Sequence, residues 1–257
     1  MVVRLLLLPG ISQNSSIFRK KLEPVLQCFG TDVHYEILDP PHKYTPEAAK
    51  QLGPWFDSSA NFDAPELHPR YWWRPTEDKP PLYRDAEASV IYLRDFLARR
   101  DQPFDGVLGF SQGGALGALL ISMLEQPELS PEFLVDGKPP HPPLRFGIVI
   151  AGFTMRDPKY LKAFVPPPLK TPLLFVVGKR DRGYARDLDL LPKFQHCRLE
   201  RHEGGHLVPT RGDWPRFFSD YIRAYDQSSV ISPSEVPSPL FTPAFSLDIT
   251  IHDRSKL

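Results

Sequence analysis

The sequence contains the run Val107-Leu108-Gly109-Phe110-Ser111-Gln112-Gly113-Gly114-Ala115, in which a short apolar strand meets a GxSxG pattern and then a helix of small residues. A strand that turns into a helix over so few residues holds the central serine in a strained conformation with its hydroxyl exposed. Only glycine lets the neighbouring backbones approach that closely. We therefore predict that Ser111 is a nucleophile at the carboxyl end of a strand.

On both sides of this turn, short β-type runs alternate with amphipathic helical stretches. The expected strands are Val2–Leu8, Val33–Leu38, Asp105–Phe110, Phe146–Ala151, Leu173–Gly178 and Cys197–Arg201. The expected helices are Ile17–Phe29, Leu82–Arg99, Gly113–Leu124, Pro158–Ala163, Tyr184–Leu191 and Trp214–Tyr225. This alternation predicts an α/β fold, with a mostly parallel sheet and helices on both faces.

A serine hydroxyl needs a base, and in this architecture the acid and the histidine follow the serine along the chain. Asp181 lies just beyond the expected strand that ends at Gly178, where a carboxylate can reach an imidazole. His206 follows the last expected strand, in a glycine-containing loop. Asp187 and Asp189 are rivals for the acid, but they fall within the next helical stretch. The predicted catalytic residues are Ser111, Asp181 and His206.

Acyl transfer also requires an oxyanion hole, in which two backbone N–H groups face the developing negative charge. The N–H of Gln112, directly after the serine, is the first expected donor. The second should come from the loop after the first strand, where Gly10 permits a tight turn. We expect Ile11 to supply it, with Ser12 as the alternative.

The run from His202 to His206 also matches HExxH, the pattern of zinc metalloproteases. That chemistry needs both histidines on one face of a helix. Gly204 and Gly205 would each cost about 1 kcal/mol in a helix, Pro209 follows closely, and the residues before His202 indicate a strand. A convincing third ligand is missing as well. We therefore predict no metal ion and no cofactor.

The composition narrows the range of partners. The 257 residues include 31 basic and 31 acidic side chains, so nothing indicates binding to nucleic acid or to an anionic membrane. The longest aliphatic run, Leu5–Leu8, is far shorter than the roughly 20 residues of a membrane span. Cys28 and Cys197 form no CxxC pair, so neither a disulfide framework nor a thiolate metal site is indicated. A small-molecule substrate is the expected partner.

Residues 1–226 are expected to form the α/β domain, with an aromatic-rich insertion at 40–81. Because aromatic side chains bury large areas at small entropic cost, this insertion could form a lid in which Trp72 and Trp73 line an apolar acyl pocket. The alternative is a surface loop whose aromatic side chains pack into the core.

The segment 227–257 is rich in serine and proline and is expected to extend from the domain and pack loosely. It ends in Ser255-Lys256-Leu257, the address that the peroxisomal import receptor reads. We therefore predict import into peroxisomes, where fatty-acyl-CoA and related thioesters occur.

Four patterns together resemble the FSH-type serine hydrolases of fungi and animals, within the α/β-hydrolase superfamily. They are Gly10…Gln13-Asn14, Gly109-Phe110-Ser111-Gln112-Gly113-Gly114, Gly178…Asp181 and Gly204-Gly205-His206…Pro209. The likeness spans residues 3–225 and implies an α/β-hydrolase fold with Ser111, Asp181 and His206 as the triad. Where the family usually has a histidine before the first glycine, this chain has Pro9.

The family includes small-ester hydrolases and thioesterases that release polyketide chains in fungal secondary metabolism. The resemblance therefore implies hydrolysis of an ester or thioester, with an acyl-CoA or a carrier-bound acyl chain as substrate. Together with the SKL ending, the chain looks like peroxisomal hydrolases of AK-type host-selective toxin clusters. Because a fold does not determine a function, a non-hydrolytic protein that holds a lipid or directs its cyclisation is the alternative.

Overall fold

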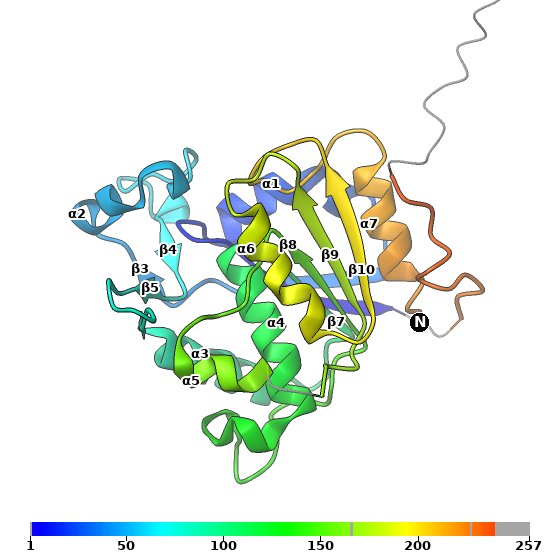
Figure 1. The fold of residues 1–257 in the computed structure, drawn as a ribbon. Coiled ribbons are helices and arrows are strands. Elements are labelled where there is room, and N and C mark those ends of the chain that lie inside the picture. Colours follow the sequence, from blue (N-terminus) through cyan, green and yellow to red (C-terminus); the bar gives the residue numbers. More distant parts are fainter. Residues whose placement is uncertain (1, 165–166, 227, 240–257) are drawn as a thin grey trace, which may run out of the picture.

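The computed structural model describes residues 2–164, 167–226 and 228–239 (Figure 1). Within these residues, six strands form one sheet in the order β10-β9-β8-β7-β1-β2, and every neighbouring pair is parallel. The strands are β1 (Val3–Leu8), β2 (Val33–Ile37), β7 (Gly106–Phe110), β8 (Phe146–Ile150), β9 (Leu173–Gly178) and β10 (Cys197–His202). The predicted parallel sheet is confirmed.

Helices cover both faces of this sheet. Helices α1 (Ser15–Gln27) and α7 (Trp214–Arg223) bury their apolar side chains on one face, together with alternate residues of β1, β7, β8 and β9. Helices α3 (Ala86–Ala98) and α4 (Gln112–Glu125) do the same on the other face. The strands between them are buried on both sides, which explains why they are continuous apolar runs rather than alternating ones.

Four expected helices are shorter than the sequence indicated, among them α7, which ends at Arg223 instead of Tyr225. The helix expected from Leu82 begins at Ala86, because β6 (Tyr83–Arg84) pairs with β5 (Arg74–Pro75) and Asp85 is left-handed, with φ +69°. Helices α5 (Pro158–Leu161) and α6 (Tyr184–Asp187) each span four residues and continue as 3₁₀ turns. The turn after α6 contains Pro192, which cannot donate a helical hydrogen bond.

The insertion at 40–81 carries α2 (Pro46–Ala49) and the small antiparallel pair β3 (His42–Lys43) and β4 (Arg70–Tyr71). The prediction that Trp72 and Trp73 line a pocket is wrong. Their exposed fractions are 0% and 2%, and both pack in the core with α3 and α4. The Trp72 indole N–H is satisfied there, because it donates to the carbonyl of Pro9 at 2.9 Å. The alternative, that aromatic side chains of the insertion enter the core, holds for these two residues.

The chain after residue 227 is expected to pack loosely, and residues 228–232 are indeed exposed, but the stretch from Pro233 to Ser238 contacts the domain. Val236 is buried against the face covered by α1 and α7. The Ser238 hydroxyl donates to Glu200 at 2.6 Å, and Arg198 donates to the carbonyl of Pro233 at 2.9 Å. The SKL ending lies outside the described residues. In the described part of the chain, no helix has the length and apolar character needed to cross a membrane.

Candidate active site

Ser111 occupies a strained turn between β7 and α4. Its φ and ψ are +53° and −116°, an unfavourable combination for a residue with a side chain. The positions on either side of this turn must be glycine, because a Cβ there would overlap with neighbouring backbone atoms. A Cβ at Gly109 would lie 2.2 Å from the carbonyl oxygen of Gly113, and a Cβ at Gly113 would lie 2.2 Å from that of Leu8. The GxSxG pattern therefore lets the start of α4 pack directly against the ends of β7 and β1.

The structure brings together the three side chains that the sequence analysis singled out. His206 Nε2 lies 2.8 Å from the Ser111 hydroxyl, and His206 Nδ1 lies 2.7 Å from Asp181 Oδ2. The other oxygen of Asp181 accepts the Gly183 N–H at 2.8 Å, which fixes the carboxylate. The loop that carries His206 is held close to β9, since a Cβ at Gly178 would lie 2.3 Å from the carbonyl of Gly205.

The environment of Asp181 favours its charged form. Burial alone would raise the pKa of this carboxyl. The hydrogen bonds from His206 and from the Gly183 amide, together with the charges of His206 and Arg186, outweigh burial and lower the pKa below its usual value. A carboxylate that stays ionised can orient the imidazole and stabilise the imidazolium that forms when Ser111 loses its proton.

Of the two rival acids, one lies close to this chain of hydrogen bonds. Asp187 is fully buried, and ligand atoms of Asp181, Asp187 and His206 lie within 4.8 Å of one another. Burial raises the pKa of Asp187 to about 6, although the Arg186 guanidinium opposes this shift. Asp187 forms no hydrogen bond to His206 in the described residues. Asp189 is exposed and pairs with Arg156 at 3.0 Å, so the geometry favours Asp181.

The predicted oxyanion donors, the backbone N–H groups of Gln112 and Ile11, have no hydrogen-bond acceptor among the described residues. The side chain of Gln112 is held by the insertion, because it accepts the Trp72 N–H at 2.9 Å and donates to the carbonyl of Trp73 at 2.8 Å. The backbone N–H of Ser12 likewise has no acceptor in the described part of the chain. Ile11 lines the cavity beside Ser111, whereas Ser12 is completely buried, so the geometry favours Ile11.

A second segment of the insertion, which the sequence analysis did not single out, lies over the site. The Trp55 ring meets the His206 ring edge to face, at 4.9 Å between centroids. The Asp57 N–H donates to the Ser12 hydroxyl at 2.7 Å, and the Asp57 carboxylate accepts from the Gln13 side chain at 2.7 Å. These bonds tie the insertion to the oxyanion loop. The insertion lacks regular periodicity, so no pattern distinguished Trp55 from Trp72.

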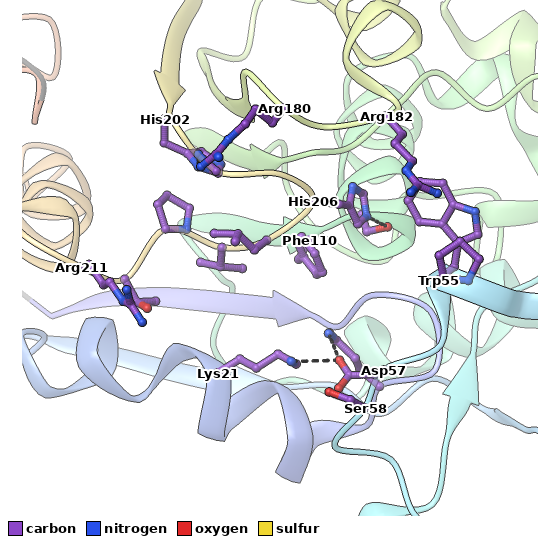
Figure 2. Close-up of a pocket in the computed structure, with 18 of the residues that line it drawn as sticks. Lys21, Trp55, Asp57, Ser58, Phe110, Arg180, Arg182, His202, His206 and Arg211 are labelled. Atoms are coloured by element: carbon purple, nitrogen blue, oxygen red, sulfur yellow. Dashed lines mark hydrogen bonds and ion pairs between the residues drawn. The ribbon is translucent and has the colours of Figure 1, made fainter.

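Ser111 and His206 open into a cavity of about 1160 Å³, shown in Figure 2. One part of its wall is apolar and includes Trp55, Phe110 and Trp214. The rest carries several cationic side chains. A cavity of this volume can hold a substrate of the size of a fatty-acyl chain or a small metabolite.

The HExxH match does not form a zinc site. His202 is the last residue of β10, and its Nδ1 accepts the Gly204 N–H at 3.1 Å. His206 lies in the following loop and contacts Ser111 and Asp181 instead. The two histidines are not on one face of a helix, which is the arrangement that the metalloprotease pattern requires.

Comparison with known proteins gives a family for this chain and several relatives. The family model described as "Serine hydrolase (FSH1)" matches residues 1–218. Esterase OVCA2 of Danio rerio is 27% identical over 237 residues, which cover 87% of this chain and 97% of that protein.

Two solved structures share the fold. A single-residue variant of Arabidopsis thaliana SOBER1 has a TM-score of 0.51 at 16% identity, covering 87% of this chain and 98% of that one. RedJ, a thioesterase from the prodiginine pathway of Streptomyces coelicolor, has a TM-score of 0.52 at 11% identity, covering 86% and 84%.

Proposed function

The chain belongs to the serine hydrolase (FSH1) family, and from this premise we propose that it cleaves an ester or thioester through an acyl-enzyme on Ser111. It is a hydrolase of the α/β-hydrolase fold that acts on ester bonds. The observation that carries the proposal is the continuous chain of hydrogen bonds from the Ser111 hydroxyl through His206 to Asp181.

The proposed reaction has two steps. His206 Nε2 takes the Ser111 proton while the serine oxygen attacks the carbonyl carbon of the substrate, and the backbone N–H groups of Gln112 and Ile11 stabilise the oxyanion. The imidazolium then gives its proton to the departing alcohol or thiol, leaving an acyl-serine. In the second step, His206 removes a proton from water, the resulting hydroxide attacks the acyl-serine, and the acid is released with the proton returned to Ser111.

The acyl-enzyme can be trapped. Mixing the protein with 4-nitrophenyl esters of graded acyl length should give a burst of about one 4-nitrophenolate per protein molecule, if deacylation is the slower step. Intact-mass measurement after an acid quench should find one added acyl group, and peptide mapping should place it on Ser111. A chelator should change neither result. If no activated ester acylates Ser111, the non-hydrolytic alternative, a protein that holds or cyclises a lipid, replaces this proposal.

We propose a thioester as the natural substrate, an acyl-CoA or a carrier-bound acyl or polyketide chain, in fungal secondary metabolism and specifically in toxin formation. The sequence resemblance to FSH-type hydrolases with an SKL ending supports this narrower proposal. The fold shared with RedJ, a thioesterase of a biosynthetic pathway, is compatible with it. Comparing kcat/KM for acyl-CoA thioesters with that for 4-nitrophenyl esters of equal length tests the preference.

We also propose that the SKL ending directs the protein to peroxisomes. A fluorescent protein fused to the N-terminus should give a punctate signal that overlaps a peroxisomal marker. Leu257→Asp should make the signal diffuse, because the import receptor reads the terminal tripeptide. Asp253→Asn, upstream of the tripeptide, serves as the matched control and should leave the punctate signal in place. A diffuse signal for the unaltered chain would contradict the proposal.

A further inference from the structure

Cationic side chains gather around the cavity of this otherwise neutral protein. Lys21, Arg180, Arg182 and Arg211 line it, and they come from three separate parts of the chain. The whole chain has equal numbers of basic and acidic residues. The net charge of the whole chain is therefore zero. Cations that cluster at one cavity nevertheless produce a local positive potential, which favours anionic ligands.

The acidic residues of the same wall do not cancel this charge. The Asp57 carboxylate is paired with Lys21 at 3.1 Å. The Glu203 carboxylate is paired with Lys179 at 2.5 Å. Each of the two lining carboxylates is thus paired with a lysine. Neither forms an ion pair with an arginine of the described lining.

The arginines have unused hydrogen-bonding capacity. Arg180 donates its Nε–H to the backbone carbonyl of Glu203 at 2.5 Å, which leaves its terminal nitrogens free of any carboxylate among the described residues. Arg182 and Arg211 form no hydrogen bond or ion pair with any other described residue, and both are exposed at the cavity. In Figure 2, Arg182 is drawn next to Trp55, whereas Arg211 is drawn at the other end of the lining.

A buried histidine adds a donor that lacks a partner. His202 lines the cavity, is only 4% exposed, and its Nε2 has no hydrogen-bond partner in the described residues. Since Nδ1 accepts the Gly204 N–H, the neutral ring carries its proton on Nε2. Burial lowers the pKa of His202, which favours that neutral form. An unpaired buried N–H is costly, and an acceptor that reached Nε2 would satisfy it.

We infer that this cavity selects substrates that carry a carboxylate or phosphate group apart from the scissile carbonyl, bound at one of the two ends of the lining (Figure 2): by Arg182 at the end near Trp55, or by Arg211, Arg180 and His202 at the other. The inference rests on the proposed function, because it places the scissile carbonyl at Ser111. A guanidinium binds either group through paired N–H···O bonds, so the two anions share one chemistry. They differ in position, because the carboxylate would end the acyl chain and the phosphates would belong to the leaving group.

Two matched substrate pairs test the inference and distinguish the sources. The first pair is 4-nitrophenyl hexanoate and mono-4-nitrophenyl adipate, which differ by a terminal carboxylate. The second is the N-acetylcysteamine thioester of hexanoate and hexanoyl-CoA, which differ by phosphates. We expect kcat/KM to be about 10-fold higher for the charged member of at least one pair, and the advantage to shrink as salt is raised.

Variants connect this preference to the named residues. Of Arg182→Gln and Arg211→Gln, the variant at the end that binds the anion should lower kcat/KM for the preferred charged substrate by about 5- to 10-fold, and both should leave the neutral partner within about 2-fold. Arg99→Gln, an exposed arginine at the end of α3, is the matched control and should change neither substrate. Equal kcat/KM values within both pairs, unchanged by the arginine variants, would overturn the charge selection while ester hydrolysis itself stood.

A binding measurement keeps the test independent of turnover. Calorimetry with Ser111→Ala protein should give a lower Kd for adipate or CoA than for hexanoate, and Arg182→Gln or Arg211→Gln in that background should raise the Kd of the anion bound at its end. Absence of acylation in the unaltered enzyme would overturn the proposed function, whereas equal binding of charged and neutral acids in this experiment would overturn the charge selection.

Discussion

Ser111→Ala should lower kcat/KM for 4-nitrophenyl esters by about 10⁵- to 10⁶-fold and abolish labelling by a fluorophosphonate probe. The loss is this large because the acyl-enzyme cannot form without the serine oxygen, so that only binding and the oxyanion donors still assist water. Ester turnover and gel fluorescence after probe treatment measure the two effects.

The fold should survive this substitution. Ser111 is 6% exposed, and removing one oxygen leaves the β7–α4 turn and its glycines in place. The melting temperature therefore reports whether a loss of activity is chemical or structural. Ser234→Ala, an exposed serine near the end of the described chain, is the control and should behave like the unaltered protein. Activity that persists in Ser111→Ala and disappears with a chelator would instead support the zinc interpretation of the HExxH pattern.

Asp181→Asn should lower kcat by about 10³- to 10⁴-fold with little change in KM. The asparagine amide would present an N–H donor to His206 Nδ1 in place of the carboxylate acceptor. The ring would then hold its proton on Nε2, where it can no longer accept the proton of Ser111. Steady-state kinetics across pH 6 to 9 would separate this loss from a simple shift of the pH optimum.

Asp187→Asn distinguishes the two buried carboxylates. Because Asp187 forms no hydrogen bond to His206 in the described residues, its substitution should cost far less activity than Asp181→Asn.

The two substitutions should change the free energy of unfolding in opposite directions. The pKa of Asp187 is raised from 3.8 to about 6, so stability is lost as pH rises through this interval and stays lower above it, and Asp187→Asn removes that cost. The pKa of Asp181 is lowered, so its charge stabilises the fold above its unfolded pKa, and Asp181→Asn loses this contribution. The reverse order of activities would make Asp187 the functional acid.

Local sequence was sufficient to predict the strained turn at Ser111 and to single out the proposed base, His206. The GxSxG run specifies its own geometry, because two glycines are needed wherever a strand and a helix pack so closely around a serine. His206 could be singled out because it is a histidine in a glycine-containing loop after the last strand. These signals depend on neighbours in the chain and on the order of residues, both of which are visible without coordinates.

The role of the insertion could not be predicted in the same way. Its aromatic content predicted a lid over the site. The composition alone did not distinguish Trp55, which lines the cavity, from Trp72 and Trp73, which pack in the core. Trp72 became a core residue because its indole N–H and backbone N–H find acceptors at Pro9 and Gln112, far away in sequence. Trp55 became a pocket residue because Asp57 anchors its segment to the loop at Ser12.

The sequence by itself determined the parallel α/β architecture and singled out the proposed nucleophile and the proposed base, because the periodicity of apolar residues and the steric demands of glycine act over short stretches of chain. The tertiary structure alone decided which carboxylate contacts His206, which tryptophan covers it, and that Arg180, Arg182 and Arg211 surround the same cavity as Lys21. These outcomes depend on burial and on hydrogen bonds between distant residues, whose energies arise only when the sheet brings the segments together.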